Sequence, residues 1–493
     1  MRHHHILGAD LSRPLDAVFV NSPLKDYDLQ PRHNDFTLPV LGLGYIATYA
    51  QSQGFNVGVL DVESLGMGLK MAAALINEVQ PRWVGLNLLA PTYRHSVRLL
   101  ALLDSDIRVM LGGHQVKAMP HDILYDADIR RIDAMVLGEG DSRVAVLLTD
   151  DDAAGSLPGV LRRAGASKGP FQGKPKSGDL LAPDINELPI VNREFFVADP
   201  FRAEDGRIEA SMVGSRGCYY DCSFCGAAIS VNRDILVRTR SPENIQRELN
   251  ELSSRYGVTA VRFVDDLFLA HPRFMTECLT SFLSEGIGER FVWDATGRIN
   301  ILDKAGDAML DLMRSTGCRE VALGIESGSE RMLKLIDKRI TPEMTKRVVQ
   351  RLTARGVKVK GYFILGFPTE TRKEMNETAK LVRDLWDIAD TNGGSFRASV
   401  FEFRPYPGTL DWHRLMATGK YEPEQLLNYE HVDLTAEGTD SAMRERDEFN
   451  FSSNIQFGEA SIAEVRETLT VLTAQQDARK LRVTRKATVG ING

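Results

Sequence analysis

Short apolar segments alternate with amphipathic ones through the first 150 residues of this 493-residue chain. The segments rich in Val, Leu and Met are short enough to be strands, and they cover residues 16–21, 56–61, 83–87, 108–113 and 134–140. A helix is expected at 68–79, and a Gly-rich helix start at 39–45. Strands separated by helices predict a parallel sheet with helices on both faces. We therefore expect a doubly wound α/β domain over residues 1–150.

The turns at the carboxyl ends of these expected strands are rich in Gly. Ligands of doubly wound sheets bind at the carboxyl ends of the strands, and Gly residues there let a ligand approach the backbone. The candidate binding residues at these turns are Gly42, Gly112, Gly113, Gly138 and Glu139.

From about residue 208 the alternation restarts with a more regular rhythm. Ser241-Pro242-Glu243 and Thr341-Pro342-Glu343 are typical helix starts, with a hydroxyl cap, a proline and an early acid. Helices are expected to end at Gly257, Gly317 and Gly356, each followed by a β-branched strand. This pattern predicts a βα barrel over residues 208–410. Residues 151–207 are predicted to be a linker containing a hairpin, and 411–493 a small helical segment that caps the open side of the barrel.

Acidic residues fall at the expected ends of the barrel strands, where βα barrels place their catalytic groups. Asp265 and Asp266 follow Val264, Asp294 follows an apolar pair, and Glu402 closes another strand. We expect these four carboxylates to act as general bases or to bind a polyol or an amine.

Three cysteines dominate the chemistry of the chain. Cys218, Cys222 and Cys225 have the spacing C-x3-C-x2-C on one Gly-flanked loop. A structural zinc site needs a fourth ligand, and the next cysteine is Cys278. An iron–sulfur cluster held by three thiolates keeps one iron open for chemistry. The loop therefore favours such a cluster, with a zinc loop as the alternative.

This loop, including Phe224 directly before its last cysteine, resembles the signature of the radical S-adenosylmethionine (SAM) superfamily. The resemblance implies a partial barrel of six βα units and a [4Fe-4S] cluster that binds SAM and cleaves it to a 5′-deoxyadenosyl radical. It also implies that Phe224 packs against the adenine, and that Ile364 and Gly366 back it. Glu326 and Ser327 are expected near the methionine and ribose parts of SAM.

The first 150 residues resemble the cobalamin-binding domain found ahead of many radical SAM cores. The matching pieces are Pro39 to Tyr45, Asp61, Gly112-Gly113, Pro120 and Gly138-Glu139-Gly140. Gln115 and Lys117 stand where that family often has a histidine and a small hydroxyl residue. No D-x-H-x-x-G motif is present, so a histidine ligand to cobalt is not indicated. The alternative is a domain of this type that has lost its cofactor and serves as a substrate lid.

Composition narrows the function classes. The formal charge is −7, with 60 Lys and Arg against 67 Asp and Glu, which does not favour nucleic acid as a partner. No apolar run reaches the ~20 residues that span a bilayer, so no membrane is expected. Cysteine is rare, and three of the five cysteines lie in one loop, which indicates a reducing cytoplasm. The expected partners are a small-molecule substrate and an electron donor such as a flavodoxin or a ferredoxin.

These observations lead to a first hypothesis of a cobalamin-dependent radical SAM C-methyltransferase of specialised metabolism, such as antibiotic biosynthesis. The second is a cobalamin-free radical SAM dehydratase or deoxygenase acting on a sugar or aminosugar. A tRNA-modifying enzyme is disfavoured by the acidic charge balance. A non-catalytic iron–sulfur or zinc protein is the fourth possibility.

Overall fold

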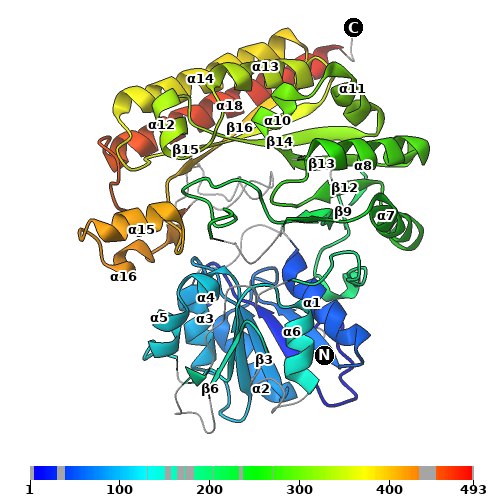
Figure 1. Cartoon of the computed structure of the whole chain (residues 1–493), viewed down its shortest axis with the longest axis vertical. Helices are drawn as coiled ribbons and strands as arrows, with labels where there is room; N and C mark the ends of the chain where they lie inside the picture. Colours follow the sequence, from blue (N-terminus) through cyan, green and yellow to red (C-terminus); the bar gives the residue numbers. More distant parts are fainter. Residues whose placement is uncertain are drawn as a thin grey trace.

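Two sheets, each with its own helices, lie one above the other in the protein (Figure 1). The computed structural model of the chain describes residues 5–29, 39–129, 131–149, 157–163, 171–172, 182–203, 205–231, 237–269, 271–431 and 451–490. Within these residues, the first sheet belongs to the N-terminal part of the chain and the second to the part that follows the linker.

The first sheet has the strand order β2-β1-β3-β4-β5-β6-β7. Its first five strands run parallel, and the last two add antiparallel pairs at one edge. The strands are β1 (Ala17–Asn21), β2 (Val57–Asp61), β3 (Trp83–Asn87), β4 (Arg108–Gly112), β5 (Ala134–Val136), β6 (Val160–Arg163) and β7 (Phe171–Gln172). The predicted doubly wound α/β architecture is confirmed.

Helices cover both faces of this sheet because side chains alternate along each strand. The helices are α1 (Leu41–Ser52), α2 (Leu69–Val79), α3 (Tyr93–Leu100), α4 (His114–Ala118), α5 (Pro120–Tyr125) and α6 (Asp141–Thr149). Along β1, Val18 and Val20 face a core shared with α2 to α5, whereas Phe19 faces the core shared with α1 and α6.

The second sheet has the order β16-β15-β14-β13-β12-β9-β8, with six parallel strands and β8 antiparallel at the edge. The strands are β8 (Phe201–Arg202), β9 (Ile208–Met212), β12 (Ala260–Phe263), β13 (Val292–Gly297), β14 (Cys318–Glu326), β15 (Lys358–Leu365) and β16 (Phe396–Glu402). A two-stranded ribbon, β10 (Ser215–Arg216) with β11 (Arg238–Thr239), flanks the cysteine loop. The six parallel strands confirm the predicted partial barrel.

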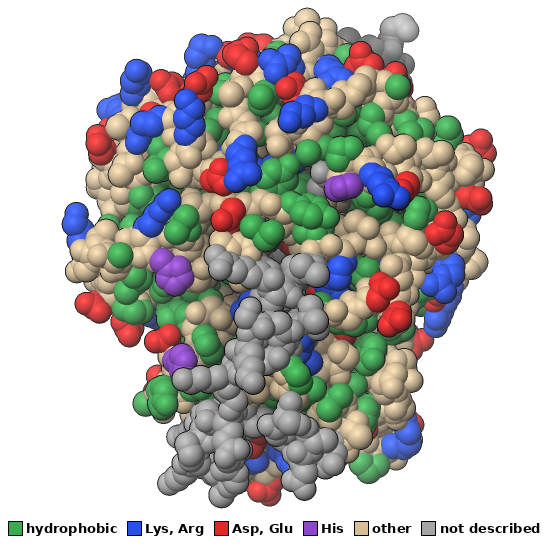
Figure 2. Space-filling view, in the orientation of Figure 1, with side chains coloured by type: hydrophobic (Ala, Val, Ile, Leu, Met, Phe, Trp, Pro, Cys, Tyr) green, Lys and Arg blue, Asp and Glu red, His purple; other side chains and the backbone are tan. Residues whose placement is uncertain are grey.

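The helices of the second sheet form its outer layer, at the top and right of Figure 1. They are α7 (Pro242–Tyr256), α8 (Pro272–Ser284), α9 (Ile287–Arg290), α10 (Ile299–Lys304), α11 (Asp307–Ser315), α12 (Glu330–Leu335), α13 (Pro342–Thr353) and α14 (Arg372–Thr391). The Ser241 and Thr341 side chains accept hydrogen bonds from the backbone of the first helical turn, as predicted. Basic and acidic side chains are interspersed over the face shown in Figure 2. One ion pair in this part of the chain joins Arg347 of α13 to Asp303 of α10 at 2.8 Å.

The segment predicted to be a linker contributes strands to both sheets. After α6, β6 and β7 extend the first sheet, and β8 begins the second after the short 3-10 helix η3 (Arg193–Phe195). Arg193 is buried and its guanidinium pairs with Asp199 at 2.8 Å and with Glu248 of α7 at 2.7 Å. This segment is therefore built into the folded core at its described positions.

The C-terminal segment divides into two parts. The first comprises α15 (Leu410–Ala417) and α16 (Pro423–Leu426), which pack with Met119 of the first domain and Phe367 of the second. The second comprises β17 (Glu430–His431), β18 (Phe451–Ser452) and α18 (Ile462–Gly490). Because α18 packs on β16 beside α14, in the outer helical layer, the expectation that the whole segment caps the open side is wrong for α18. Among the described helices, none has the length and apolar character needed to cross a membrane.

Candidate active site

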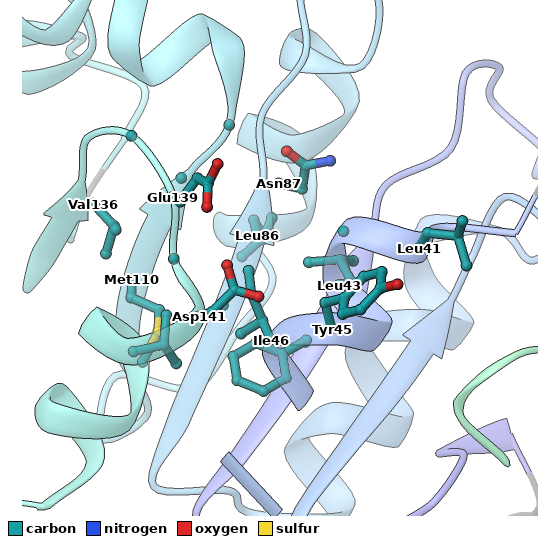
Figure 3. A pocket seen from close by; sticks show the side chains of 18 of the residues that line it. Leu41, Leu43, Tyr45, Ile46, Leu86, Asn87, Met110, Val136, Glu139 and Asp141 are labelled. Atoms are coloured by element: carbon teal, nitrogen blue, oxygen red, sulfur yellow. The ribbon is translucent and has the colours of Figure 1, made fainter. Parts of the chain in front are cut away.

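A cavity of about 250 Å³ opens at the carboxyl edge of the first sheet (Figure 3). It is bounded by the start of α1 and by the turns after β3, β4 and β5. All five residues predicted for this edge line it: Gly42, Gly112, Gly113, Gly138 and Glu139. The side chains around them are mostly apolar, including Leu43, Ile46, Leu86, Met110 and Val136. The strand order reverses direction between β1 and β3, so this glycine cavity occupies the usual ligand position of a doubly wound sheet.

The glycines that line this cavity differ in whether the backbone would tolerate a side chain. Gly113 has φ of 95°, and a Cβ there would lie 2.2 Å from Asn87 Oδ1. Gly138 has φ of 80°, which L side chains rarely adopt. A Cβ at Gly42 would meet nothing within 4 Å. The fold therefore tolerates a side chain at position 42, where it would take up space in the cavity.

Gln115 and Lys117 do not line the glycine cavity. Both line a separate cavity of about 550 Å³ between the two domains, and Lys117 also lines a third of about 360 Å³. Gln115 is buried, with its Nε2 donating to Met119 Sδ at 3.4 Å and its Oε1 without a hydrogen-bond partner. The sequence left open whether these two long side chains fill the cofactor space. The structure places them beside it.

The three cysteines lie on the loop between β10 and β11, facing the first domain. Cys222 is buried, while Cys218 and Cys225 are partly buried, and all are free thiols. The Cys225 N–H donates to the Cys222 carbonyl at 3.1 Å, which folds the loop into a turn. Burial raises the pKa of the Cys225 thiol to about 12 and also raises that of Cys218. A bound cationic cluster would reverse this effect, because metal coordination deprotonates a thiol.

The residues predicted to flank adenine come together beside this loop. The Phe224 ring lies 5.6 Å from the Phe367 ring, centroid to centroid, and packs into the same apolar cluster as Ile364. Gly366 has φ of 86°, and its N–H donates to the buried carboxylate of Glu370 at 2.6 Å. Burial raises the pKa of Glu370 to about 7. Glu370 thus fixes the turn after β15.

Glu326 and Ser327 stand in different settings at the end of β14. Glu326 has φ of 65° and its Oε1 accepts a hydrogen bond from Lys338 Nζ at 2.7 Å. Lys338 also lies 5.9 Å from the centre of the Phe224 ring, so this ion pair is next to the cysteine loop. The Ser327 hydroxyl is fully buried, 3.1 Å from Thr378 Oγ1, and accepts from the Ser329 N–H. Its hydroxyl is therefore engaged within the fold.

Asp265 and Asp266 follow β12 but point to different surroundings. The Asp265 carboxylate is buried and accepts hydrogen bonds from the N–H groups of Gly214 and Ser215, just before the cysteine loop. Asp266 is exposed within the cleft between the domains and lines both the 550 Å³ and the 360 Å³ cavities. Desolvation raises the pKa of Asp266, whereas the nearby His114 lowers it. Of the two, Asp266 is the one that a ligand in the cleft can reach.

Asp294 and Glu402, the other two predicted acids, line none of these three cavities. Asp294 lies near the start of β13, which continues to Gly297, and its carboxylate pairs with Arg319. Glu402 does end β16, but strand alternation turns it away from Phe403 and the inner cluster. Its carboxylate accepts a hydrogen bond from Ser452 and one from Arg466 Nε of α18 at 3.4 Å. Both carboxylates belong to structural networks.

The cavities form a continuous row between the two domains. The glycine cavity and the 360 Å³ cavity share Gly42, Asn87, Gly113, Gly138, Glu139, Val213 and Arg216. The 360 Å³ and 550 Å³ cavities share Leu89, His114, Lys117, Ala227 and Asp266. Ala227 follows the last cysteine by two residues, so the row passes directly beside the cysteine loop. We call this row the interdomain cleft.

An ion cluster that the sequence did not reveal joins the two domains at this cleft. Arg216 Nη1 lies 2.8 Å from Glu139 Oε2 and 3.0 Å from Asp141 Oδ2, and Arg238 also pairs with Glu139. The Arg216 guanidinium stacks on Tyr45 at 5.0 Å. Arg216 precedes Cys218 by two residues, while Glu139 lines the glycine cavity. These charged residues meet only through tertiary contacts between distant parts of the sequence, so no local sequence motif predicts the ion cluster.

Comparison with known families agrees with this geometry. Residues 212–382 match the model of the Radical SAM superfamily, and residues 34–148 match the model of the B12 binding domain. The first match contains the cysteine loop and strands β12 to β15, and the second contains most of the residues that line the glycine cavity.

Individual relatives are distant but cover most of the chain. The chain is 27% identical over 400 residues to the uncharacterized methyltransferase PH0819 of Pyrococcus horikoshii, covering 80% of this chain and 83% of the relative. It is 26% identical over 438 residues to the cytidylyl-2-hydroxyethylphosphonate methyltransferase of Streptomyces wedmorensis, covering 78% and 79%. Among solved structures, the cobalamin-dependent SAM radical enzyme OxsB, with aqua-cobalamin and SAM bound, superposes with a TM-score of 0.63 at 14% identity, covering 93% of this chain and 66% of OxsB.

The fold and the cysteine loop define a radical SAM enzyme. More particularly, the chain carries a B12 binding domain ahead of the radical SAM domain. This confirms the family predicted from the sequence, and with it the predicted cofactors: a [4Fe-4S] cluster, SAM and cobalamin.

The residues in place fit these groups. Three free thiols on one loop suit a cluster with one open iron, and the cations Arg298 and Lys338 lie near them. The glycine cavity gives a large flat ligand access to backbone, since a Cβ is missing at six of its lining positions.

Proposed function

We propose that the protein is a cobalamin-dependent radical SAM methyltransferase that methylates a carbon atom of a small molecule in specialised metabolism, with antibiotic biosynthesis as one setting. The observation that carries this proposal is the interdomain cleft, in which the glycine cavity and the cysteine loop open onto one shared space. Methyl transfer to an unactivated carbon needs both cofactors within reach of one substrate.

The proposed roles follow from the placements. Cys218, Cys222 and Cys225 would hold the cluster, and Phe224, Ile364 and Gly366 would enclose the adenine of SAM. Glu326, through its pair with Lys338, would face the methionine part, while Ser327 would support the turn behind it. Gly42, Gly112, Gly113 and Gly138 would admit cobalamin, with Glu139 holding the edge of its cavity.

When bound, the cluster and SAM supply a hydrogen-abstracting radical, and cobalamin supplies the methyl group. The residues around them position the substrate and exclude water. Phe367, Phe403 and Trp412 are buried in the apolar cluster that contains Phe224, which keeps that side of the cleft dry. Asp266 is the carboxylate we assign to the substrate, since it alone among the four predicted acids lines both interdomain cavities.

The substrate pocket proposed here is the 550 Å³ cavity. Its polar lining includes His114, Lys117, Asp266, Tyr406 and His413. Burial lowers the pKa of His114, so that its imidazole is neutral near pH 7 and able to accept a proton. The volume suits a small molecule with ionisable groups. A small polar substrate is also what the name of the Streptomyces relative describes.

Two further parts of the proposal concern the cellular setting. Reduction of the cluster needs an external electron donor, for which a flavodoxin or a ferredoxin is the proposed class. The five free cysteines support a reducing compartment such as the cytoplasm.

The decisive experiment fills the glycine cavity. Protein produced anaerobically with abundant cobalamin should carry about one corrinoid per chain by absorption and mass spectrometry. Gly42→Leu should reduce this to less than about a tenth, because the new side chain occupies the cavity without a backbone clash. Iron content and 5′-deoxyadenosine formation with a chemical reductant should remain.

The matched control is Gly306→Leu, at an exposed glycine where a Cβ also meets nothing within 4 Å. This variant should keep its corrinoid. Wild-type protein that forms 5′-deoxyadenosine with no bound corrinoid would contradict the proposal. Loss of water from the substrate in that protein would support the alternative, a cobalamin-free radical dehydratase.

A further inference from the structure

A buried arginine touches one of the three cysteines. Arg298 follows β13 directly, and its side chain is 6% exposed. Its Nη1 donates to Cys222 Sγ at 3.5 Å. Among the described residues, this is the one hydrogen bond that we identify from a charged side chain to a cysteine sulfur.

The guanidinium is held on three further sides. Its plane stacks on the Tyr220 ring, with Cζ 3.4 Å from the ring centroid. Nη2 donates to the Lys338 carbonyl at 2.6 Å, and Nε donates to Asn300 Oδ1 at 3.2 Å. Asn300 in turn donates to the Tyr220 hydroxyl at 3.2 Å. The charge is thus fixed in position rather than free to swing into solvent.

The charge of Arg298 is also uncompensated by a neighbouring acid. Among the described residues, no carboxylate lies within ion-pairing distance of it, and its hydrogen bonds go to neutral acceptors and to sulfur. Lys338 differs, because Glu326 neutralises it at 2.7 Å.

We propose that Arg298 is a positioning residue that raises the reduction potential of the cluster by placing a fixed positive charge against Cys222. This inference rests on the proposed function only in requiring that the loop holds an iron–sulfur cluster. Hydrogen bonds to the ligating sulfurs and nearby charge are established means of tuning such a cluster.

The physical reason is the electron balance of the step. The cluster accepts one electron from a low-potential donor of the flavodoxin or ferredoxin class, and no bond forms or breaks in that transfer. The added negative charge is stabilised by a cation a few ångströms away, and burial limits the screening by water. Arg298 therefore favours the reduced cluster, the state from which SAM is cleaved.

The test is a redox titration of the cluster in the full chain without SAM, followed by electron paramagnetic resonance. Arg298→Met should lower the ratio of reduced to oxidised cluster at a fixed potential at least tenfold, which corresponds to a shift of about 59 mV for a one-electron couple. Arg298→Lys keeps the charge but loses the planar fork, so its shift should be smaller. The matched control is Arg339→Met, which removes an exposed cation paired with Asp337. Its ratio should change less than threefold.

The possible results separate a failure of this inference from a failure of the proposed function. An unchanged potential in Arg298→Met with a full complement of iron would overturn the inference while leaving the cluster assignment intact. An equal shift in Arg339→Met would overturn it too, because any cation near the loop would then act alike. Absence of iron from the wild-type protein would instead contradict the proposed function. If Arg298→Met does not fold, Asn300→Ala loosens the same guanidinium, and its potential should fall in the same direction by a smaller amount.

Discussion

Asp265 shows how burial decides what one carboxyl does. It sits at the carboxyl end of a strand, as a catalytic acid of a βα barrel would, yet its oxygens are taken by two backbone N–H groups. Burial raises its pKa to about 7, against the lowering effect of those donors. Its place in the protein is to hold the strand that leads to the cysteine loop.

This raised pKa predicts a pH-dependent stability. The native carboxyl keeps its proton up to about pH 7, whereas the unfolded one loses it near 3.8. Its stabilising contribution is therefore complete below about pH 4 and is lost as the pH rises through 7. Asp265→Asn is neutral at every pH. The free energy of unfolding of wild type minus that of Asp265→Asn should fall by up to about 3 kcal/mol between pH 5 and pH 8.

Urea unfolding of the cluster-free protein at the two pH values measures this difference. The comparison at one pH cancels the titration of other groups. A difference that stays constant from pH 5 to pH 8, or that grows, would show that Asp265 is ionised throughout.

At the residue scale, the sequence predicted those site residues that can be recognised from a short motif alone. The cysteine spacing and the glycines of the turns needed no tertiary information, and all five predicted cavity residues line one cavity. Asp294 was misplaced because the end of β13 cannot be read from the apolar run before it. Glu402 lies between Phe401 and Phe403, so the period of two along a strand already indicated that it faces the opposite side of the sheet from these two rings. Arg298 and Arg216 carry no such signal, because their partners are far away in sequence.

At the scale of elements, the cysteine loop is tied to helix α15. The Ser223 hydroxyl donates to Asp411 Oδ2 at 2.8 Å, and the Asp411 N–H donates to the Ser223 carbonyl at 2.9 Å. The Ser223 N–H donates to the Ile336 carbonyl after α12. A loop that must hold a cluster is thus anchored between its first and last cysteine.

Asp411→Ala should loosen this anchor. It leaves the buried Ser223 hydroxyl without its acceptor, at a cost of about 1–3 kcal/mol. Amide hydrogen exchange at residues 222–226 of the cluster-free protein should become about tenfold faster, since tenfold corresponds to about 1.4 kcal/mol. Asp411→Asn keeps an acceptor oxygen and should exchange at nearly the wild-type rate. Equal exchange in Asp411→Ala and wild type would show that the backbone hydrogen bonds of Ser223 anchor the loop without the Asp411 side chain.

Elements themselves were well predicted where local rules act. The Ser241 and Thr341 caps and the left-handed glycines 257, 317 and 356 lie where the sequence placed them. The position of α18 was not predictable, because an amphipathic helix after the last strand can cover either side of a sheet. Its packing is decided by the free surface of β16 beside α14.

At the scale of the whole molecule, the ion cluster around Arg216 holds the domains together at the cleft. Asp141 is buried, so removing its partner leaves a carboxylate supported only by its place in the first turn of α6. Breaking a buried pair from one side typically costs 3–5 kcal/mol.

Arg216→Met should therefore open the cleft and speed the release of corrinoid from the glycine cavity severalfold, measured by chasing washed protein with cobalamin-free buffer. Hydrogen exchange at 138–144 should rise in the same protein. Arg255→Met is the matched control, because its pair with Glu194 is exposed on both sides. Release at the wild-type rate in Arg216→Met would show that the apolar contacts at Met119 hold the domains without help.

The segment between the domains contributes strands to both sheets, and this determines where the chain can be cut into separately folding domains. A product ending at residue 150 would lack β6 and β7 and present the bare edge of β5, an invitation to pair with other chains. A product beginning at residue 208 would lack Arg193 and leave the buried Glu248 with Arg240 as its one remaining ion-pair partner among the described residues. Both domains depend on residues from the segment that the sequence predicted to be a linker: the first on β6 and β7, the second on Arg193. Any division of this enzyme must therefore keep residues 157–163 and 171–172 with the first domain and residues 182–203 with the second.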